Sequence, residues 1–390
     1  MDFLLAMLIL LLFAKIFGDA MHRLGFSSLI GEVFAGVLLG PALLGLVPSS
    51  DALYGIAMLG LVLLMLVAGM NSRFDLFTKI KFKAFVIAIF GMSVSFLFAF
   101  VVSYSMGFEL LPSLFVAAAL SNTATEITAR FTTGHHLSQV IVSAALVDDI
   151  IAVYILGILS ASTVIGTLNI EVLILATISI IAFFLIIGYL SHLLIIKHDM
   201  IRRLWKYEAR GIPLLFVVSL ALALAVIAQN IGLHAIIGAY MAGLFIGRMR
   251  ERPMAMLQGR IHYNKIMNDI SNNLQTILTP IFFAYVGLKF APNWGGMNLL
   301  MIAVLLIAAF AGKIIGCGGG AAVMVLNSRD SITVGTAMSA RGSLELSMLH
   351  FGFISLGAYG FTSELFATMV IITLATTIFT PILFKYVSKT

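Results

Sequence analysis

Two adjacent aspartates, Asp148 and Asp149, lie in the middle of the apolar run VSAALVDDIIAVYILGIL. A charged side chain at the centre of a membrane helix costs about 2.5–3.5 kcal/mol on insertion scales, so such residues usually serve a function. Carboxylate oxygens bind small hard cations, and they also bind protons. Because one carboxylate cannot hold both at once, the pair predicts a site where sodium and protons compete.

The alternative interpretation is that the two aspartates only bridge helices, although apolar residues would hold such helices better. Neighbouring residues point about 100° apart around a helix axis. We therefore expect the carboxylates of Asp148 and Asp149 to differ, with one facing a partner and the other a cavity.

A buried cation partner for this pair is Lys313, in the apolar run AFAGKIIGCGGG. An ammonium inside a membrane helix requires an anion, so we expect Lys313 to pair with one of the two aspartates. The alternative is that its long side chain reaches the membrane interface. Cys317, the single cysteine, follows in the same run, where we expect a small packing residue without a disulfide or metal.

Two further apolar segments are interrupted by polar runs, SNTATEITAR from Ser121 to Arg130 and TAMSARGSLELS from Thr336 to Ser347. Broken helices at corresponding positions of two repeats mark the binding sites of many secondary transporters. We expect the first interruption to line the ion site with side-chain oxygens of Ser121, Asn122, Thr123 and Thr125.

Charged residues in both interruptions stand four apart, which is the spacing of an ion pair within one helix. Glu126 with Arg130 and Arg341 with Glu345 are therefore expected to be structural pairs, with gating or ion admission as the alternative for the two glutamates. Glu32, in GEVFAGVLLGP, is expected to be an interhelical hydrogen-bond partner, with a transport role as the alternative.

The composition indicates a membrane protein, because 61% of the 390 residues are hydrophobic and only 10% are charged. Runs long enough to cross a bilayer predict thirteen helices. They fall at about 3–21, 28–47, 52–70, 84–105, 111–132, 138–163, 170–196, 211–229, 231–249, 272–290, 297–325, 331–357 and 363–387. The start of the chain lacks the basic region and cleavage site of a signal peptide, so we expect the first helix to be retained.

Basic residues are distributed unequally between alternate loops. Odd-numbered loops and the C-terminal tail hold eighteen Lys and Arg, whereas even-numbered loops hold only Lys289. Since positive charge accumulates on the cytoplasmic side, this predicts an N-terminus outside and a cytoplasmic C-terminus, in a multi-pass protein of the cell (inner) membrane.

Thirteen helices divide into six, one and six. This predicts a first repeat at about 3–163, a linker helix at about 170–196 and an inverted second repeat at about 211–387, in one transport domain (1–390) without a soluble regulatory domain. No phosphate-binding loop, HExxH, CxxC or GxSxG motif is present, so we expect neither an enzyme nor an ATP-driven pump, and no cofactor. The sequence contains no basic stripe interleaved with aromatic residues, so we do not expect nucleic-acid binding.

The order and spacing of several motifs resemble the monovalent cation:proton antiporters, in particular the bacterial and archaeal electrogenic sodium/proton branch related to potassium-efflux transport domains. The motifs are GEVFAGVLLGP, TATEITARF, VDD, PIFFAYVGL, GKIIG and SARG. The resemblance implies an all-α fold of thirteen helices with crossed, discontinuous fifth and twelfth helices, and a homodimer. It also implies Asp149 as the ion and proton carrier, Asp148 as the partner of Lys313, and Thr123 and Thr125 at the crossing.

The function expected from residues and resemblance together is electrogenic sodium/proton antiport by alternating access, which would serve pH homeostasis. The protein would be surrounded by membrane lipid. The transported ions would be sodium and protons, with lithium or potassium as further candidates. The alternatives are a potassium/proton antiporter on the same scaffold, or a cation channel or sensor. Ser343, where many relatives have an acidic residue, and Glu126 depart from the family pattern and leave ion choice and pH dependence open.

Overall fold

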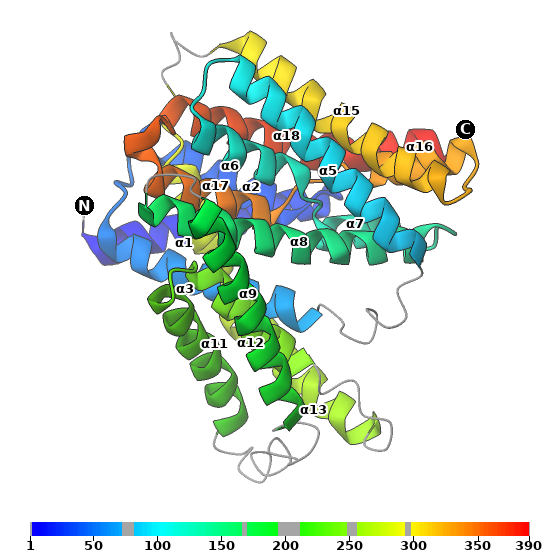
Figure 1. Cartoon of the computed structure of the whole chain (residues 1–390). Coiled ribbons are helices and arrows are strands. Elements are labelled where there is room, and N and C mark those ends of the chain that lie inside the picture. The colour runs from blue at the N-terminus through cyan, green and yellow to red at the C-terminus, as the bar shows by residue number, and fades with distance from the viewer. Residues whose placement is uncertain are drawn as a thin grey trace. The chain divides into compact units, whose positions relative to one another are not determined.

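The computed structural model describes residues 2–71, 82–165, 170–193, 211–247, 256–292 and 298–389, and these contain helices and no strands (Figure 1). The α-helices are α1 (Phe3–Arg23), α2 (Ser28–Leu39), α3 (Asp51–Asn71), α5 (Phe82–Ser105), α6 (Leu110–Ser121), α7 (Thr125–Phe131), α8 (Ser138–Ile165), α9 (Ile170–Ser191), α11 (Ile212–Asn230), α12 (Ala235–Gly247), α13 (Met256–Asp269), α14 (Thr276–Leu288), α15 (Leu299–Val323), α16 (Ser328–Ala337), α17 (Ser343–Ser355) and α18 (Ser363–Lys389). A π-helical turn, Ile270–Gln275, joins α13 to α14.

Nine helical segments within the described ranges are long and apolar enough to cross a membrane, and α2 and α12 are shorter apolar helices. The all-helical, multi-pass prediction is therefore confirmed, whereas the total of thirteen spans stays a prediction. The chain divides into two compact units. The first comprises Met1–Ser50, Ile80–Leu156 and Phe283–Thr390, and the second comprises Asp51–Lys79 and Gly157–Phe282.

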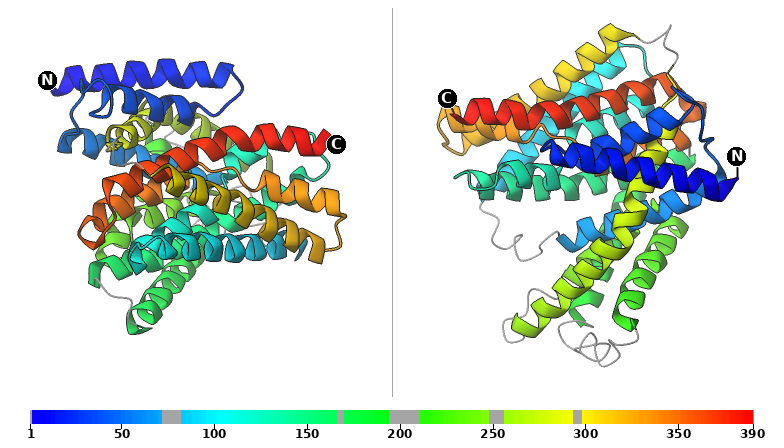
Figure 2. Two further views of the ribbon diagram at one scale, coloured as in Figure 1. Left: turned by 90° about the horizontal axis from the view of Figure 1, so that it is seen from above. Right: turned by 180° about the vertical axis from the view of Figure 1, so that it is seen from behind.

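In the first unit, α5 and α15 run side by side in all the views of Figures 1 and 2. Small residues allow this contact: a Cβ on Gly316 would lie 2.9 Å from the Cα of Gly91, and a Cβ on Gly312 would lie 2.8 Å from the Cα of Ser95. Close backbone approach of this kind replaces the hydrophobic effect as the main source of helix association in lipid. It fixes the position of Lys313, which follows Gly312 directly.

The second unit is also built on glycine contacts. A Cβ on Gly69 of α3 would lie 2.1 Å from the carbonyl oxygen of Tyr240 in α12, and one on Gly238 would lie 2.1 Å from the carbonyl oxygen of Leu224 in α11. These distances leave no room for a side chain, so α3 and α11 each pack backbone to backbone against α12.

Both segments predicted to be interrupted are broken in the structure. Extended residues separate α6 from α7 at 122–124, and non-helical residues separate α16 from α17 at 338–342. The two breaks hydrogen-bond to each other, because Ala124 donates its N–H to the Ala340 carbonyl at 2.9 Å. The Thr123 hydroxyl oxygen also lies 2.8 Å from the Met338 carbonyl oxygen, so the two breaks contact each other at a second point.

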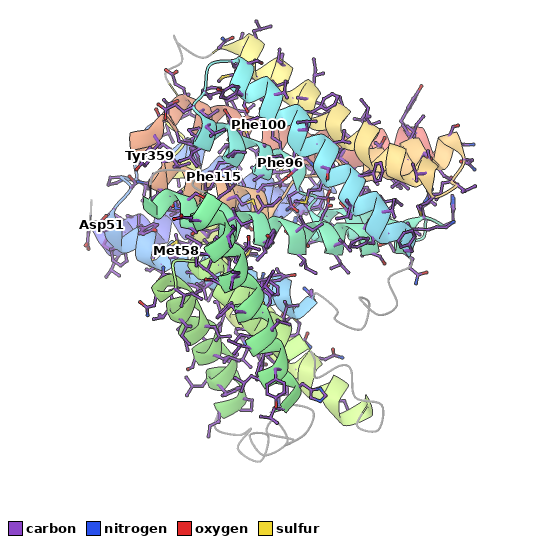
Figure 3. The ribbon with its side chains drawn as sticks, in the orientation of Figure 1. Asp51, Met58, Phe96, Phe100, Phe115 and Tyr359 are labelled. Carbon is purple, nitrogen blue, oxygen red and sulfur yellow. The ribbon has the colours of Figure 1, made fainter. Side chains whose placement is uncertain are left out.

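Aromatic packing holds α6 against α17 beyond the breaks. Phe115, labelled in Figure 3, lies with its ring centroid 5.8 Å from that of Phe351. A Cβ on Gly352 would lie 2.9 Å from the Phe115 ring, so this glycine admits the ring.

The guanidinium of Arg341 lies between the broken segments and α15, fully buried. It donates to the carbonyls of Asn122 at 2.7 Å, Ala309 at 3.2 Å and Leu120. The last residues of a helix leave carbonyls without an intrahelical donor, and in an apolar environment each needs another one. Arg341 supplies donors to the end of α6.

The predicted pair of Arg341 and Glu345 is present, with Nε and Oε1 3.2 Å apart. Glu345 also accepts a hydrogen bond from the backbone N–H of Gly342, at the start of α17. This carboxylate therefore balances the buried guanidinium and caps the helix at once.

Several predicted boundaries are wrong. The helix predicted at 28–47 ends at Leu39, because Gly40 leaves the helical conformation, Pro41 has no N–H to donate, and the chain turns back so that the Val47 N–H reaches the Leu39 carbonyl at 2.9 Å. The helix predicted at 231–249 begins at Ala235, after a turn through Gly232 with φ of 82°. The segment predicted at 272–290 continues an earlier helix from Met256. Predicted ends at 196, 249 and 297 lie outside the described residues.

Replacing Arg341 should destabilise the protein. Arg341→Met would leave buried carbonyls and the Glu345 carboxylate without their partner, at about 1–3 kcal/mol for each orphaned group. We expect a lower melting temperature for detergent-solubilised protein, measured by loss of the monodisperse peak in size-exclusion chromatography after heating. Arg329→Met, at an exposed position of α16, is the matched control. Equal melting temperatures for the two variants would contradict this role.

Candidate functional site

The Asp148 carboxylate is fully buried and bound from two directions. Its Oδ2 atom accepts a hydrogen bond from the Thr123 hydroxyl at 2.7 Å and forms a salt bridge with the Lys313 ammonium. Lys313 is also fully buried, so it does not reach the membrane interface as the alternative interpretation required. Asp148 thus joins α8 to the break between α6 and α7 and to α15.

Asp149 has a different environment from its neighbour. Its side chain is partly exposed, and its Oδ2 atom accepts a hydrogen bond from the Thr125 hydroxyl at 2.7 Å. Among the described residues, no salt bridge to Asp149 is formed. The two adjacent carboxylates therefore have separate partners, as their angular separation on a helix requires.

The break between α6 and α7 positions both threonines. Thr123 lies in extended backbone, where its hydroxyl lies between Asp148 and the Met338 carbonyl. Thr125 is the first residue of α7 and faces Asp149. A continuous helix would rotate two residues separated by one position about 200° apart, so the extended stretch is what brings both hydroxyls to α8.

Oxygen atoms suited to a small cation remain available beside this pair. Within the described residues, Oδ1 of Asp148 and Oδ1 of Asn122 are buried and accept no hydrogen bond. Carboxylate and amide oxygens are ligands for hard cations. The described residues contain no group of three His, Cys, Asp or Glu side chains that could hold a metal ion, so a transported cation would have to use these mixed oxygens.

The other predicted lining residues take local roles. The Ser121 hydroxyl donates to the Ala118 carbonyl of its own helix at 3.0 Å. Arg341 donates to the backbone carbonyl of Asn122, and the side-chain Oδ1 of Asn122 is buried without a hydrogen bond.

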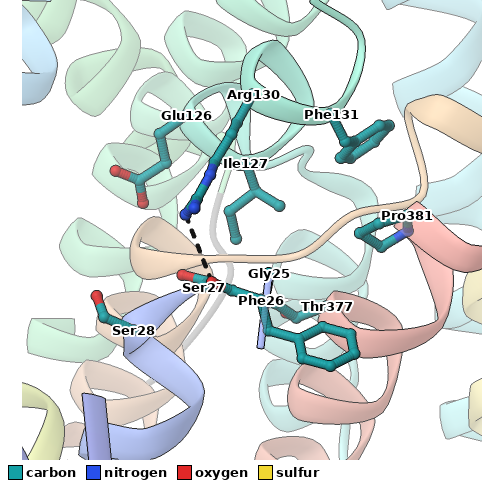
Figure 4. A pocket seen from close by; sticks show the side chains of 10 residues that line it. All are labelled: Gly25, Phe26, Ser27, Ser28, Glu126, Ile127, Arg130, Phe131, Thr377 and Pro381. Carbon is teal, nitrogen blue, oxygen red and sulfur yellow. Dashed lines mark hydrogen bonds between the residues drawn. The ribbon is translucent and has the colours of Figure 1, made fainter. Parts of the chain in front are cut away.

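The predicted pair of Glu126 and Arg130 does not form. Arg130 donates to the Phe26 carbonyl at 3.4 Å and contacts the His22 ring at 3.2 Å, as the dashed line in Figure 4 partly shows. Glu126 lies instead within hydrogen-bonding reach of the Ser343 hydroxyl, at the start of α17. A tertiary contact with the connection between α1 and α2 has displaced the local i,i+4 pair, which is weak by itself.

Glu32 is buried, and its carboxylate lies within hydrogen-bonding reach of Ser28, one turn earlier on α2. This hydrogen bond lies within one helix, so the expected interhelical hydrogen bond of Glu32 stays a prediction. Its neighbour across the helix interface is Gly18 of α1, where a Cβ would lie 3.1 Å from the Glu32 side chain.

The connection between α7 and α8 carries a histidine cluster outside the spanning helices. The His135 ring lies 4.5 Å from that of His136 and 5.3 Å from that of Phe384 between centroids. Burial and the neighbouring His136 lower the pKa of His135 below its usual 6.5, against the opposing charge of Asp330. His136 in turn contacts Asp330 at 3.2 Å.

Sequence reasoning missed several contributors to this region. Thr377 of α18 donates to the Arg341 carbonyl at 2.7 Å, and Thr128 donates to the Ala337 carbonyl at 3.4 Å. The threonine-rich run TLATTIFT in the last helix was a signal for the first of these. The contact of Arg130 with Phe26 joins residues 104 positions apart and left no signal in the sequence.

The chain is similar to characterised antiporters over its whole length. It is 26% identical to the Na(+)/H(+)-K(+) antiporter GerN of Bacillus cereus, over 99% of this chain and 96% of that protein. It is 25% identical to the Na(+)/H(+) antiporter of Enterococcus hirae, over 100% of this chain and 99% of that protein.

The fold is similar to that of the sodium proton antiporter MjNhaP1 from Methanocaldococcus jannaschii, with a TM-score of 0.71 and 15% identity over 98% of this chain and 96% of that one. The model of the transmembrane sodium/hydrogen exchanger family matches residues 8–387. The resemblance inferred from the motifs is confirmed, and the chain belongs to the sodium/hydrogen exchanger family.

Proposed function

We propose that this protein exchanges sodium for protons by alternating access, with Asp149 as the carrier. The observation that carries the proposal is the asymmetry of the aspartate pair. Asp148 is fully buried and bound by Lys313, whereas Asp149 is partly exposed and has only the Thr125 hydroxyl. A carboxylate with a single neutral partner can accept either a proton or a cation.

Competition at one carboxylate is enough to couple the two ions. If Asp149 holds a proton or sodium but never both, each opening of the site to one side exchanges one ion for the other. The Thr125 hydroxyl can donate to the ionised carboxylate and, by rotating, accept from the protonated one. The orphaned Oδ1 atoms of Asp148 and Asn122 provide further ligands for sodium.

The charge balance indicates how exchange becomes electrogenic. With Asp149 protonated, or with sodium bound to its carboxylate, the trio of Asp148, Asp149 and Lys313 carries the same net charge. Exchange of one sodium for one proton is therefore electroneutral. Electrogenic exchange requires a second proton, and we propose that it leaves the Lys313 and Asp148 pair when sodium engages Asp148.

A potassium/proton antiporter on the same scaffold is the second candidate. It is favoured by the similarity to GerN, whose name includes potassium as well as sodium. Lithium is a further candidate substrate, because the same oxygen ligands suit it.

We further propose a multi-pass position in the cell membrane, with the N-terminus outside and the C-terminus cytoplasmic. The unequal distribution of Lys and Arg between alternate loops supports this orientation. A homodimer is proposed from the family resemblance, and the two inverted repeats from the sequence pattern.

Asp149→Asn should abolish exchange, because the neutral amide does not take up a proton and has no negative charge to bind sodium. We expect the rate of sodium-driven pH change in everted vesicles to fall by about two orders of magnitude or more, because ionisable residues inside a membrane usually carry the transported ion. Asp19→Asn, at an exposed aspartate paired with Lys15, is the matched control and should exchange normally. Exchange by Asp149→Asn at the parental rate would overturn the proposed mechanism. The same assay of the parent protein with sodium, potassium and lithium identifies the transported ion.

Lys313→Gln should remove the dependence of exchange on membrane voltage, because only Asp149 then releases a proton in exchange for sodium. The measurement is sodium flux in proteoliposomes with the membrane potential set by potassium and valinomycin. Parent protein should respond to voltage, and the variant should not. A variant that remains as voltage-sensitive as the parent would exclude Lys313 as the source of the second proton.

A further inference from the structure

The turn that ends α1 holds a backbone carbonyl beside a histidine ring. The Gly25 N–H donates to the His22 carbonyl and the Phe26 N–H donates to the Met21 carbonyl, both at 3.0 Å, and Gly25 has a φ of 89°. This is the Schellman arrangement that ends many helices, with a glycine in the left-handed region. It fixes the Phe26 carbonyl relative to the last turn of α1, which carries the His22 ring.

Arg130, near the end of α7, contacts both acceptors of this turn. Its Nη1 atom lies 3.4 Å from the Phe26 carbonyl oxygen, as the dashed line in Figure 4 shows, and its Nη2 atom lies 3.2 Å from Nε2 of His22. A guanidinium has only donors, so the His22 ring must offer a lone pair at Nε2. A protonated ring has no lone pair and carries a positive charge. The contact between Arg130 and His22 therefore requires a neutral ring.

A second partner for Arg130 is available on its own helix. Glu126 lies four residues earlier, in the order that favours an ion pair within a helix, and both side chains are exposed and line the same pocket. In the described part of the chain they form no salt bridge with each other, and Figure 4 shows them leaving α7 separately. Arg130 therefore has two sets of possible partners, one on the α1 turn and one on α7.

The position of α7 depends on the contacts at its ends. A helix of seven residues is too short to be stable alone, so what it touches fixes where it lies. At its start, the Thr125 hydroxyl binds Asp149 at 2.7 Å. At its end, the Phe131 ring lies 5.1 Å from that of Phe384 in α18, and Arg130 contacts the α1 turn. The aromatic contact does not change with pH, whereas the contact of Arg130 with the histidine does.

Other charged or titratable side chains lie on the elements around this contact. They are Lys15, Asp19 and Arg23 of α1, Glu32 of α2, Glu126 of α7, and His135, His136 and Asp330 beside the end of α7. Lys15 and Asp19 pair with each other at 3.3 Å. Glu32 and the two histidines after α7 also bind protons, so a variant of His22 that leaves them in place separates their titration from that of His22.

We propose that Arg130 positions α7, and with it the Thr125 hydroxyl at Asp149, and that protonation of His22 releases this position. At neutral and alkaline pH the neutral ring accepts from Arg130, and the carrier site is complete. As the pH falls, His22 gains a proton and repels the guanidinium, which turns to Glu126. The contact is thus present above the titration of His22 and lost below it. This inference rests on the proposed function and adds a pH response that is separate from competition at Asp149.

Kinetics separate this response from competition between ions. Protons that compete with sodium at Asp149 raise the apparent KM for sodium, and saturating sodium overcomes them. A change in the position of α7 lowers the maximal rate, which saturating sodium does not restore. The measurement is exchange of radioactive sodium for sodium in proteoliposomes, with saturating sodium and the same pH on both sides, so that no proton has to cross the membrane.

His22→Gln should remove the pH response of the maximal rate, because an amide oxygen accepts from Arg130 at every pH. In the parent we expect the maximal rate to fall about three- to tenfold between pH 8 and pH 5.5, the range in which histidine ordinarily gains its proton. In His22→Gln the rate should match the parent at pH 8 and change by less than about twofold at pH 5.5. His22→Lys, with a fixed positive charge, should be slow throughout. The same substitutions at His192, an exposed histidine after α9, are the matched controls and should follow the parent.

Glu126→Gln tests the second partner of Arg130. Without this carboxylate the released guanidinium has no anion on α7, so its contact with His22 should persist to lower pH. We expect the pH of half-maximal rate to decrease by about 0.2–0.4 units, the size expected for one ion pair within a helix. An unchanged pH of half-maximal rate would overturn the proposed change of partners.

Hydrogen exchange of the α7 backbone reports the same event without transport. After correction for intrinsic exchange rates, protection of Thr125–Phe131 should fall at pH 5.5 in the parent and persist in His22→Gln. A parental maximal rate that does not fall in acid, or an equal fall in the parent and in His22→Gln, would overturn the proposal. If the parent exchanges no sodium, the proposed function fails, whereas hydrogen exchange still tests the contact between Arg130 and His22.

Discussion

The buried carboxylate of Asp148 is the point on which the rest of the site depends. One of its oxygens is bound by an ammonium from α15 and by a hydroxyl from the break between α6 and α7. A charge in an apolar interior is tolerated only when paired and hydrogen-bonded. This requirement explains the glycine contacts that bring α15 against α5, since they place Lys313 at the depth of Asp148. It also explains why the chain is broken at Thr123, since the extended backbone there presents a hydroxyl to each aspartate.

The same requirement governs the breaks themselves. Two interrupted helices expose carbonyls that lipid cannot satisfy, and they meet at Ala124 and Ala340, where each offers the other a partner. Arg341 supplies donors to three further carbonyls, and Glu345 balances its charge. With these groups satisfied, Asp149 is left with one neutral partner and a partly exposed side chain. That difference between two neighbouring carboxylates is what we propose the protein uses to couple two ions.

Hydropathy and spacing predicted much of this arrangement. Charges inside apolar runs identified Asp148, Asp149 and Lys313, and polar runs inside apolar segments identified both breaks, because lipid makes such residues costly unless they are used. The sequence did not predict the partner of Arg130, since a contact with Phe26 depends on how distant segments pack. It also overestimated the helix after Ser28, where apolar residues continue past Leu39 but Gly40 and Pro41 end the helical conformation. Hydropathy measures the environment of a residue and says little about backbone direction.

Competition between sodium and protons at Asp149 can be measured as sodium-induced proton release from purified protein. Sodium chloride added to detergent-solubilised protein in weak buffer should release protons, recorded with a pH-sensitive dye, whereas choline chloride should not. Release should diminish at alkaline pH, where Asp149 is already ionised, and should be absent in Asp149→Asn. Sodium binding without proton release, at a pH where the parent is active, would contradict the account.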